Sequence, residues 1–343
     1  MTGKEVVLKT INREKTSRLP VVIFSGGAWT FNNKGFTLQE ILGKAELAAG
    51  IIAGTNEHLE SDIIWAGSGF NNLPVRALGG KIKFRAKGTM DVQEPLFDKA
   101  ADVDRINLDR LKQDEEIRSI YETAALLEQS IGRHTLVGGC GWGPFTLAAQ
   151  FYGVEKIMQG IYKDKPAVHA VLEFAAEASF QYYAPFLESG AQILSVAEPT
   201  ASGDLISRNH FEEFTLPYLK KFMKRLKGAG AINLLHICGD ITNRLDLIPE
   251  SGADVLSVDY KVDLGRVRET LGTKMAFAGN VNPVDVLVDA TPEEVAAAAR
   301  QCIEKAGQDS YYILMPGCDL SPGVPLKNLQ AMIATGKNWP VAS

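Results

Sequence analysis

The sequence has few cysteines, no long apolar run and no excess of positive charge. Each of these features excludes a class of protein. The net charge is −5 over 343 residues, whereas a nucleic-acid-binding face needs a surplus of Lys and Arg. No apolar run approaches the roughly 20 residues of a bilayer-spanning helix. Four cysteines without a secretory signal predict a reducing compartment. We therefore expect a cytoplasmic protein with no nucleic-acid partner and no membrane association.

Nucleotide-binding motifs and domain linkers are also missing. No Gly-x-Gly-x-x-Gly follows the first predicted strand, and the glycine-rich segment 138–143 lacks the Lys-Ser/Thr of a phosphate-binding loop. No stretch rich in Pro or Ser and no break in composition divides the chain. The sequence therefore predicts a single domain over residues 1–343.

Short apolar runs alternate with segments of helical spacing along the whole chain. The runs are predicted as buried strands because they are short, rich in branched side chains and stopped by Gly, Pro or an acidic residue. They cover residues 20–24, 62–65, 135–139, 192–197, 232–237, 255–258, 275–278 and 311–314. Eight strands, each followed by a helix, predict an α/β fold of the (β/α)8 TIM barrel type.

Two additions to the barrel are predicted from local patterns. Thr2 followed by Glu5 forms a capping box, which predicts an N-terminal helical extension. Residues 81–85 alternate polar and apolar side chains after Gly79-Gly80, which is typical of a half-exposed hairpin. We expect this small hairpin insertion to lie outside the barrel.

Residues with coordinating side chains stand at the predicted C-terminal ends of the strands, where barrel enzymes keep their active sites. His236 and Cys238 end the fifth strand and point to the same side because they are two residues apart. Cys318 follows the eighth strand. Imidazole and thiolate suit zinc, and three protein ligands beside an open position are typical of a catalytic zinc site. The alternative is an inert group of core side chains.

Two carboxylates end the predicted strands on either side of the fifth. Glu198 ends the fourth strand and Asp259 the sixth. Each is a candidate to complete the metal shell or to hold the His236 ring by a hydrogen bond. Zinc with two thiolates and one imidazole is suited to binding a thiol and keeping it deprotonated. Thiol alkylation is therefore the favoured chemistry, and zinc-dependent hydrolysis is the second.

The segment His236-Ile-Cys238-Gly-Asp240, with the distant Cys318, resembles the His-x-Cys…Cys zinc motif of the methylcobamide:coenzyme M methyltransferases. These enzymes belong to the uroporphyrinogen decarboxylase superfamily. Segments 143–148, 198–207, 279–283 and 322–325 resemble other stretches of the superfamily, with Glu198 where Asp is usual. The similarity extends over nearly the whole chain, and the zinc motif is its specific part.

The resemblance implies a zinc-dependent methyltransferase in which His236, Cys238 and Cys318 bind the metal and serve catalysis. A thiol acceptor bound there attacks the methyl group of a methylcobamide. A separate corrinoid protein presents this cofactor, because the chain has no Asp-x-His-x-x-Gly corrinoid motif. The corrinoid is expected over the barrel mouth, with Gly139, Trp142 and Asn280 as binding residues.

The methyl acceptor and the direction of transfer stay open. Coenzyme M, another thiol or tetrahydrofolate could accept the methyl group, and Arg208 or Lys261 could serve a sulfonate. The same architecture could demethylate a small methylated donor onto a corrinoid protein, or only bind a corrinoid or porphyrin. Decarboxylation of a porphyrinogen is disfavoured, because residues 24–34 contain no arginine and no histidine follows His236.

Overall fold

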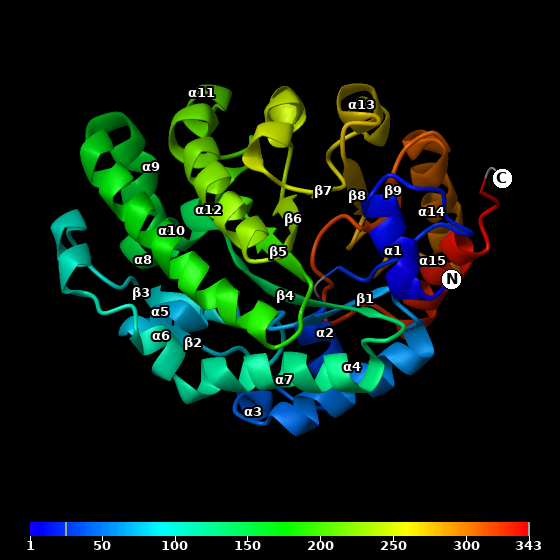
Figure 1. Cartoon of the computed structure of the whole chain (residues 1–343), viewed down its shortest axis with the longest axis horizontal. Helices are drawn as coiled ribbons and strands as arrows, with labels where there is room; N and C mark the ends of the chain where they lie inside the picture. Colours follow the sequence, from blue (N-terminus) through cyan, green and yellow to red (C-terminus); the bar gives the residue numbers. More distant parts are fainter. Residues whose placement is uncertain (25, 342–343) are drawn as a thin grey trace.

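The computed structural model describes residues 1–24 and 26–341, and it places a curled parallel sheet at the centre of a layer of helices (Figure 1). Every pair of neighbouring strands in this sheet is parallel. In sheet order the strands are β1 (Ile63–Ala66), β4 (Leu136–Trp142), β5 (Ile193–Ala197), β6 (Ile232–Ile237), β7 (Val255–Val258), β8 (Ala276–Val281) and β9 (Tyr312–Pro316). The predicted α/β class is confirmed, with strands at seven of the eight expected places.

The first expected strand is the exception. In residues 20–24 the structure has only an isolated parallel bridge between Val21 and Leu314. The Val22 N–H donates to the Leu314 carbonyl (2.9 Å), and the Val21 carbonyl accepts from the N–H of Asp62 (2.9 Å), so this segment lies between β9 and the start of β1. The prediction of a strand is wrong here because the Val21 N–H donates to the Asp62 carboxylate (2.8 Å) rather than to a ladder partner.

Helices cover the outer face of the sheet and connect its strands. Those before β4 are α1 (Gly3–Ile11), α2 (Gly27–Asn32), α3 (Leu38–Ile41), α4 (Ala45–Leu59), α5 (Leu73–Leu78), the 3₁₀ turn η1 (Ala100–Arg105), α6 (Arg110–Gln113) and α7 (Glu115–Ile131). Those after it are α8 (Pro144–Tyr152), α9 (Val154–Lys163), α10 (Lys165–Glu188), η2 (Pro199–Ala201), α11 (Arg208–His210), the π-turn η3 (Phe211–Thr215), α12 (Leu216–Gly228), η4 (Thr242–Ser251), α13 (Leu264–Leu271), α14 (Pro292–Ala306) and α15 (Leu326–Lys337). None of the helices in the described ranges has the length and apolar character needed to cross a bilayer.

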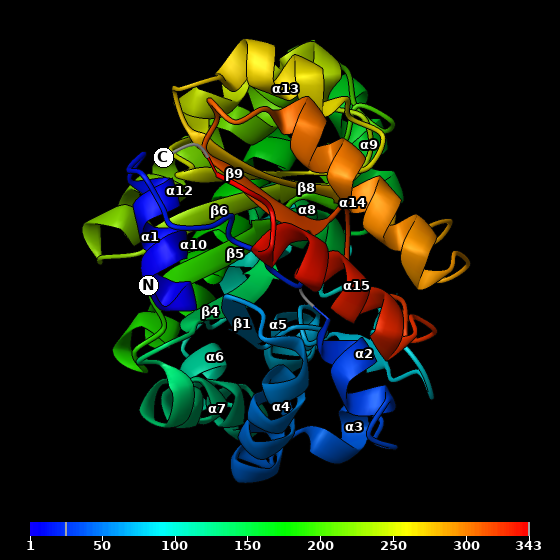
Figure 2. The ribbon, with the colours of Figure 1, turned by 90° about the vertical axis from the view of Figure 1, so that its right-hand side faces the viewer.

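The predicted N-terminal helix is confirmed as α1, and its capping box is present. It lies at the end of the sheet where the strands begin (Figure 2). Val7 belongs to the same buried apolar cluster as Ile63 and Leu136, whose side chains fill the inside of the curled sheet. The Lys4 N–H donates to the His134 carbonyl (2.8 Å) just before β4. The helix therefore covers the N-terminal end of the sheet, which leaves the C-terminal end for the functional site.

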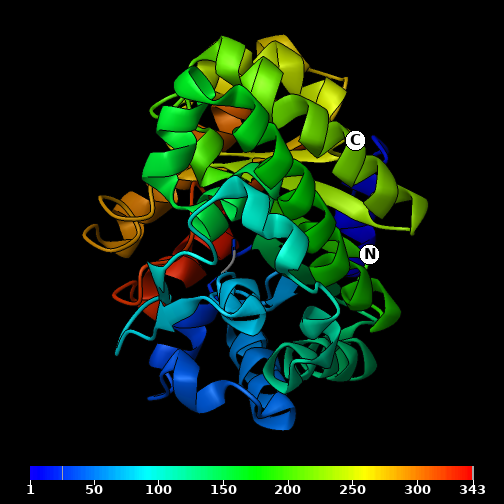
Figure 3. The ribbon, with the colours of Figure 1, turned by 90° about the vertical axis from the view of Figure 1, so that its left-hand side faces the viewer.

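The predicted hairpin insertion is also confirmed. Strands β2 (Lys81–Lys83) and β3 (Asp91–Glu94) pair antiparallel outside the main sheet. In Figure 3 the termini lie on the right and the light-blue to cyan hairpin lies on the opposite side. The Asn72 side chain donates to the Met90 carbonyl (3.0 Å) and ties the hairpin connection to the rim of the sheet.

Candidate metal centre

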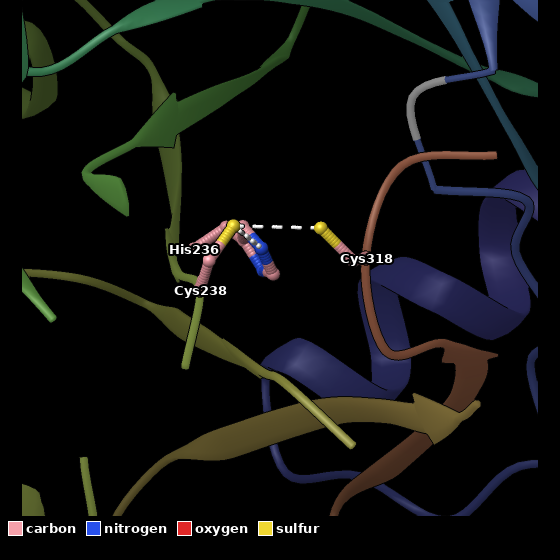
Figure 4. A group of neighbouring side chains, drawn as sticks. All are labelled: His236, Cys238 and Cys318. Atoms are coloured by element: carbon pink, nitrogen blue, oxygen red, sulfur yellow. Dashed lines mark hydrogen bonds between the residues drawn. The ribbon is translucent and has the colours of Figure 1, made fainter. Parts of the chain in front are cut away.

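The three predicted ligands meet at the C-terminal ends of the strands (Figure 4). His236 lies in β6, Cys238 follows that strand directly, and Cys318 follows β9. The Nε2 atom of His236 is 3.1 Å from the sulfur of Cys238, which is 3.4 Å from the sulfur of Cys318. One ligand atom from each residue lies within 4.8 Å of the others. Across residues 1–24 and 26–341, this is the one group of three such residues close enough to share an ion.

The spacing of these atoms fits zinc. Zinc bonds of about 2.3 Å to sulfur and about 2.0 Å to nitrogen, at tetrahedral angles, separate the ligand atoms by roughly 3.5–3.8 Å. The observed separations of 3.1 and 3.4 Å are a few tenths of an ångström shorter, which small side-chain movements can correct. Two sulfurs and one imidazole are also the donor types that zinc prefers over hard cations such as Mg²⁺.

Ser257 orients the histidine ring. His236 is 1% exposed and Ser257 is fully buried; they stand side by side on β6 and β7 in the parallel register. The Nδ1 atom of His236 is 2.8 Å from the Ser257 hydroxyl, and the Phe24 ring packs against the imidazole at 4.4 Å between centroids. A ring whose Nδ1–H donates to Ser257 presents its Nε2 lone pair to a metal. Ser257 was missed from the sequence, where a single serine in an apolar run was its only signal.

The two cysteines share their protons unequally. A hydrogen bond from the Cys238 thiol lowers the pKa of Cys318, and hydrogen bonding to His236 acts in the same direction. The same interaction, together with burial, raises the pKa of Cys238. The pair therefore loses one proton readily and holds the second. A cation between the two sulfurs is what would keep both of them ionised at neutral pH.

Glu198 lies outside the three-residue group. Its carboxylate is fully buried and accepts hydrogen bonds from the N–H groups of Phe145 (2.9 Å) and Thr146 (2.7 Å) at the start of α8. Burial raises its pKa to about 7, although these hydrogen bonds act in the opposite direction. The structure thus places this candidate metal ligand as a link between the end of β5 and the start of α8.

Asp259 also lies outside the group. It is 5% exposed, and its two oxygens accept hydrogen bonds from the N–H groups of Gly239 (2.9 Å) and Lys261 (3.0 Å). The bond to Gly239 fixes the turn directly after Cys238. Neither predicted carboxylate holds the His236 ring, because Ser257 occupies that position.

A cavity of about 180 Å³ opens beside the three-residue group and includes all three of its members in its wall. Of the predicted corrinoid-binding residues, Trp142 lines this cavity, where its indole N–H donates to Asn72 (2.7 Å). Gly139 faces away from the cavity, since a Cβ there would lie 2.6 Å from the Phe186 ring. The Asn280 side-chain amide donates hydrogen bonds to the carbonyls of residues 259 and 262. Asn280 lines a separate hollow.

Comparison with known proteins identifies relatives over almost the whole chain. A family model described as Uroporphyrinogen decarboxylase (URO-D) matches residues 2–339. The methylcobamide:CoM methyltransferase MtbA of Methanosarcina mazei is 33% identical over 223 residues, which cover 65% of this chain and 64% of that protein. MtbA of Methanosarcina acetivorans is 31% identical over 220 residues, covering 64% and 63%. The matched region spans slightly less than two thirds of these relatives. A solved structure of a methyltransferase from Methanosarcina mazei superposes with a TM-score of 0.88 at 26% identity and covers 98% of both chains.

Proposed function

The chain belongs to the uroporphyrinogen decarboxylase (URO-D) family, and on this premise we propose that it is a zinc-dependent methyltransferase. It transfers a methyl group from a methylated corrinoid, presented by a separate corrinoid protein, to a small thiol. The observation that carries the proposal is the group of His236, Cys238 and Cys318, whose ligand atoms lie within 4.8 Å of one another in the wall of a cavity. The similarity to proteins named methylcobamide:CoM methyltransferases supports it.

The residues of the site have different roles. His236, Cys238 and Cys318 would hold zinc, which supplies a Lewis acid that keeps a bound thiol ionised at neutral pH. Ser257 fixes the ring of His236. Phe24 and Trp142 give the cavity aromatic walls, which exclude water and strengthen electrostatic interactions inside. The acceptor sulfur attacks the methyl carbon, the S–C bond forms as the Co–C bond breaks, and the electron pair of that bond stays on cobalt.

The family name alone would suggest a decarboxylase, and the cavity argues against that activity. A porphyrinogen carries several carboxylates, and their recognition calls for arginine or lysine side chains. Among the described residues that line the cavity, none is arginine or lysine. Cation-free walls beside a thiol-rich metal centre favour transfer chemistry at sulfur.

The position of the first expected strand bears on the architecture around this site. We infer that residues 20–24 complete an eightfold barrel, since Val21 and Val22 bond to Asp62 on one side and Leu314 on the other. The partner protein would then approach the C-terminal rim, onto which the cavity opens.

Zinc analysis and a methyl-transfer assay test the proposal. Protein purified without chelator should hold about one equivalent of zinc and, with a thiol, should convert methylcobalamin to cob(I)alamin, followed by absorbance. 2-Mercaptoethanol, coenzyme M, homocysteine and tetrahydrofolate are tested separately. Less than about half an equivalent of zinc, or no turnover with any acceptor, would contradict it. Turnover in the opposite sense, from a small methylated donor onto cob(I)alamin, would assign the chain to the donor side.

A further inference from the structure

We propose that the acceptor is a small thiol that carries a hydrogen-bond donor, such as a hydroxyl or ammonium group, and no anionic group within two or three carbons of its sulfur. This inference rests on the proposed function and names the acceptor class for the same site. The cavity of about 180 Å³ is smaller than the roughly 300–1,000 Å³ of sites for drug-sized ligands. An acceptor bound there is small, so that its second functional group lies close to the metal centre.

The charged side chains around the cavity are of the wrong sign for an anionic thiol. Among its described lining residues, Asp319 is the one carboxylate, and none carries a fixed positive charge. An oxygen of Asp319 accepts hydrogen bonds from the N–H groups of Gly26 and Leu320, both at 2.8 Å. These bonds hold the carboxylate at the cavity wall.

The two cations that could have reached a sulfonate are engaged elsewhere. Arg208 pairs with Asp246 (2.6 Å) and with Glu212 (2.9 Å). Lys261 pairs with Asp204 at 2.7 Å. Neither Arg208 nor Lys261 lines the cavity, so an anion inside it would find neither of these side chains.

Three backbone donors at helix starts close to the site are also occupied. The first free N–H groups of α8, from Phe145 and Thr146, donate to the Glu198 carboxylate. The Gly27 N–H at the start of α2 donates to the Ser68 hydroxyl (2.7 Å). An anion that entered the cavity would have to shed its hydration without a cation among the lining residues to pair with, and burial of an unpaired charge is costly.

The charge of the metal centre also disfavours an anionic thiol. One dication with two thiolates and a neutral imidazole is electrically neutral, so a bound acceptor thiolate makes it negative. A sulfonate or carboxylate two carbons away would place a second negative charge at close range in a site of low dielectric. An ammonium group there would be attracted, and a hydroxyl group would be indifferent to the charge.

Asn71 is a candidate hydrogen-bond acceptor for a neutral or cationic tail. Asn71 lines the cavity, and the side-chain oxygen of Asn71 is buried with no hydrogen-bond partner in the described part of the chain. A buried carbonyl oxygen without a donor is unfavourable. A hydroxyl or ammonium group on the acceptor would satisfy it, whereas a sulfonate carries no proton to donate.

Three thiols with the same two-carbon spacing test the inference: 2-mercaptoethanol, cysteamine and coenzyme M, which is 2-mercaptoethanesulfonate. They are assayed with methylcobalamin and zinc-loaded protein at matched thiolate concentrations. We expect kcat/KM for the hydroxyl and ammonium thiols to exceed that for the sulfonate at least tenfold. An equal or higher value for coenzyme M with the unmodified protein would overturn the inference.

A matched pair of variants tests the electrostatic cause. Thr89 is exposed and lines the cavity, so Thr89→Arg supplies a cation at its rim and should narrow the ratio at least threefold in favour of the sulfonate. Thr273 is exposed in the turn before β8, at the opposite end of the strands. Thr273→Arg adds the same charge there and should leave the ratio unchanged. An equal effect of the two variants would refute the local explanation.

Binding to protein with Co²⁺ in place of zinc separates this inference from the proposed function. Thiolate binding changes the visible absorbance of Co²⁺, so affinities can be ranked without turnover. The expected order of binding without methyl transfer would remove the proposed function and leave the selectivity standing. Methyl transfer with the sulfonate preferred would do the reverse. Absence of any spectral change with all three thiols would overturn the inference.

Discussion

Ser257→Ala tests how far the proposed metal centre depends on a residue outside the proposed ligand set. The hydroxyl of Ser257 lies 2.8 Å from Nδ1 of His236, and both side chains are shielded from water. Alanine removes this partner, and the Nδ1–H group then lies buried without an acceptor. The ring is free to rotate or to take the tautomer that protonates Nε2, which cannot bind a metal.

The magnitude follows from two independent estimates. An unsatisfied buried donor costs about 1–3 kcal/mol. Loss of the partner of a metal-bound histidine typically lowers metal affinity by about 10–100-fold, equivalent to about 1.4–2.8 kcal/mol. The two ranges agree, so we expect zinc affinity to fall by one to two orders of magnitude.

Competition with a fluorescent zinc chelator measures this affinity directly. Ser251→Ala is the matched control, because Ser251 is fully buried and its hydroxyl donates to the Ile248 carbonyl (2.7 Å) in η4, without contact to His236. The control should lose stability and keep its zinc affinity. If Ser257→Ala retains zinc within twofold of the unmodified protein, the assigned role of Ser257 is incorrect.

Three further predictions test the ligands, a buried carboxylate and a glycine. Cys318→Ala should abolish zinc retention and methyl transfer while the circular dichroism spectrum is kept. Cys302→Ala, outside the group, should keep zinc and methyl transfer. A zinc-free but active Cys318→Ala protein would contradict the assignment. The folded-state pKa of Glu198 is about 7 against an ordinary 4.5. Its contribution to stability is therefore fully present below pH 4.5 and is lost as the pH rises through 7. Urea unfolding should therefore show stability falling with pH by up to about 3 kcal/mol relative to Glu198→Gln, and parallel pH profiles would refute this. Gly139→Ala places a Cβ 2.6 Å from an aromatic ring and should lower the free energy of unfolding by about 1–3 kcal/mol. Gly50→Ala, on an open helix face, should raise it by about 0.5–1 kcal/mol. Equal shifts of the two melting temperatures would contradict the packing role of Gly139.

The sequence was sufficient to predict where the three candidate ligands meet, because that depends on topology. Parallel strands end at the same edge of a sheet, so His236 and Cys238 after one run and Cys318 after another were expected at one rim. The structure brings their ligand atoms within 4.8 Å. The seven strands at expected places and the capped N-terminal helix follow from equally local patterns of apolar spacing and capping.

The partners of these side chains could not be predicted in the same way. Glu198 was a candidate metal ligand by its place at a strand end, yet its carboxylate turns to the start of α8. Gly139 suggested room for a ligand, yet its missing side chain admits the Phe186 ring. Ser257 drew no attention, although it holds the histidine. Each outcome depends on side-chain direction and on packing between segments distant in sequence, which strand-end position leaves open.

The hydrogen bonds between the segment around Val22 and Leu314 have a consequence for folding during synthesis on the ribosome. They join segments that are far apart in the sequence, and contacts so distant in sequence form slowly. Until β9 emerges, β8 and the segment around Val22 each have an edge without its final neighbour, and such edges pair readily with other chains. Nascent chains that stall before β9 are therefore expected to be substrates for chaperones and the main source of aggregated material during rapid expression.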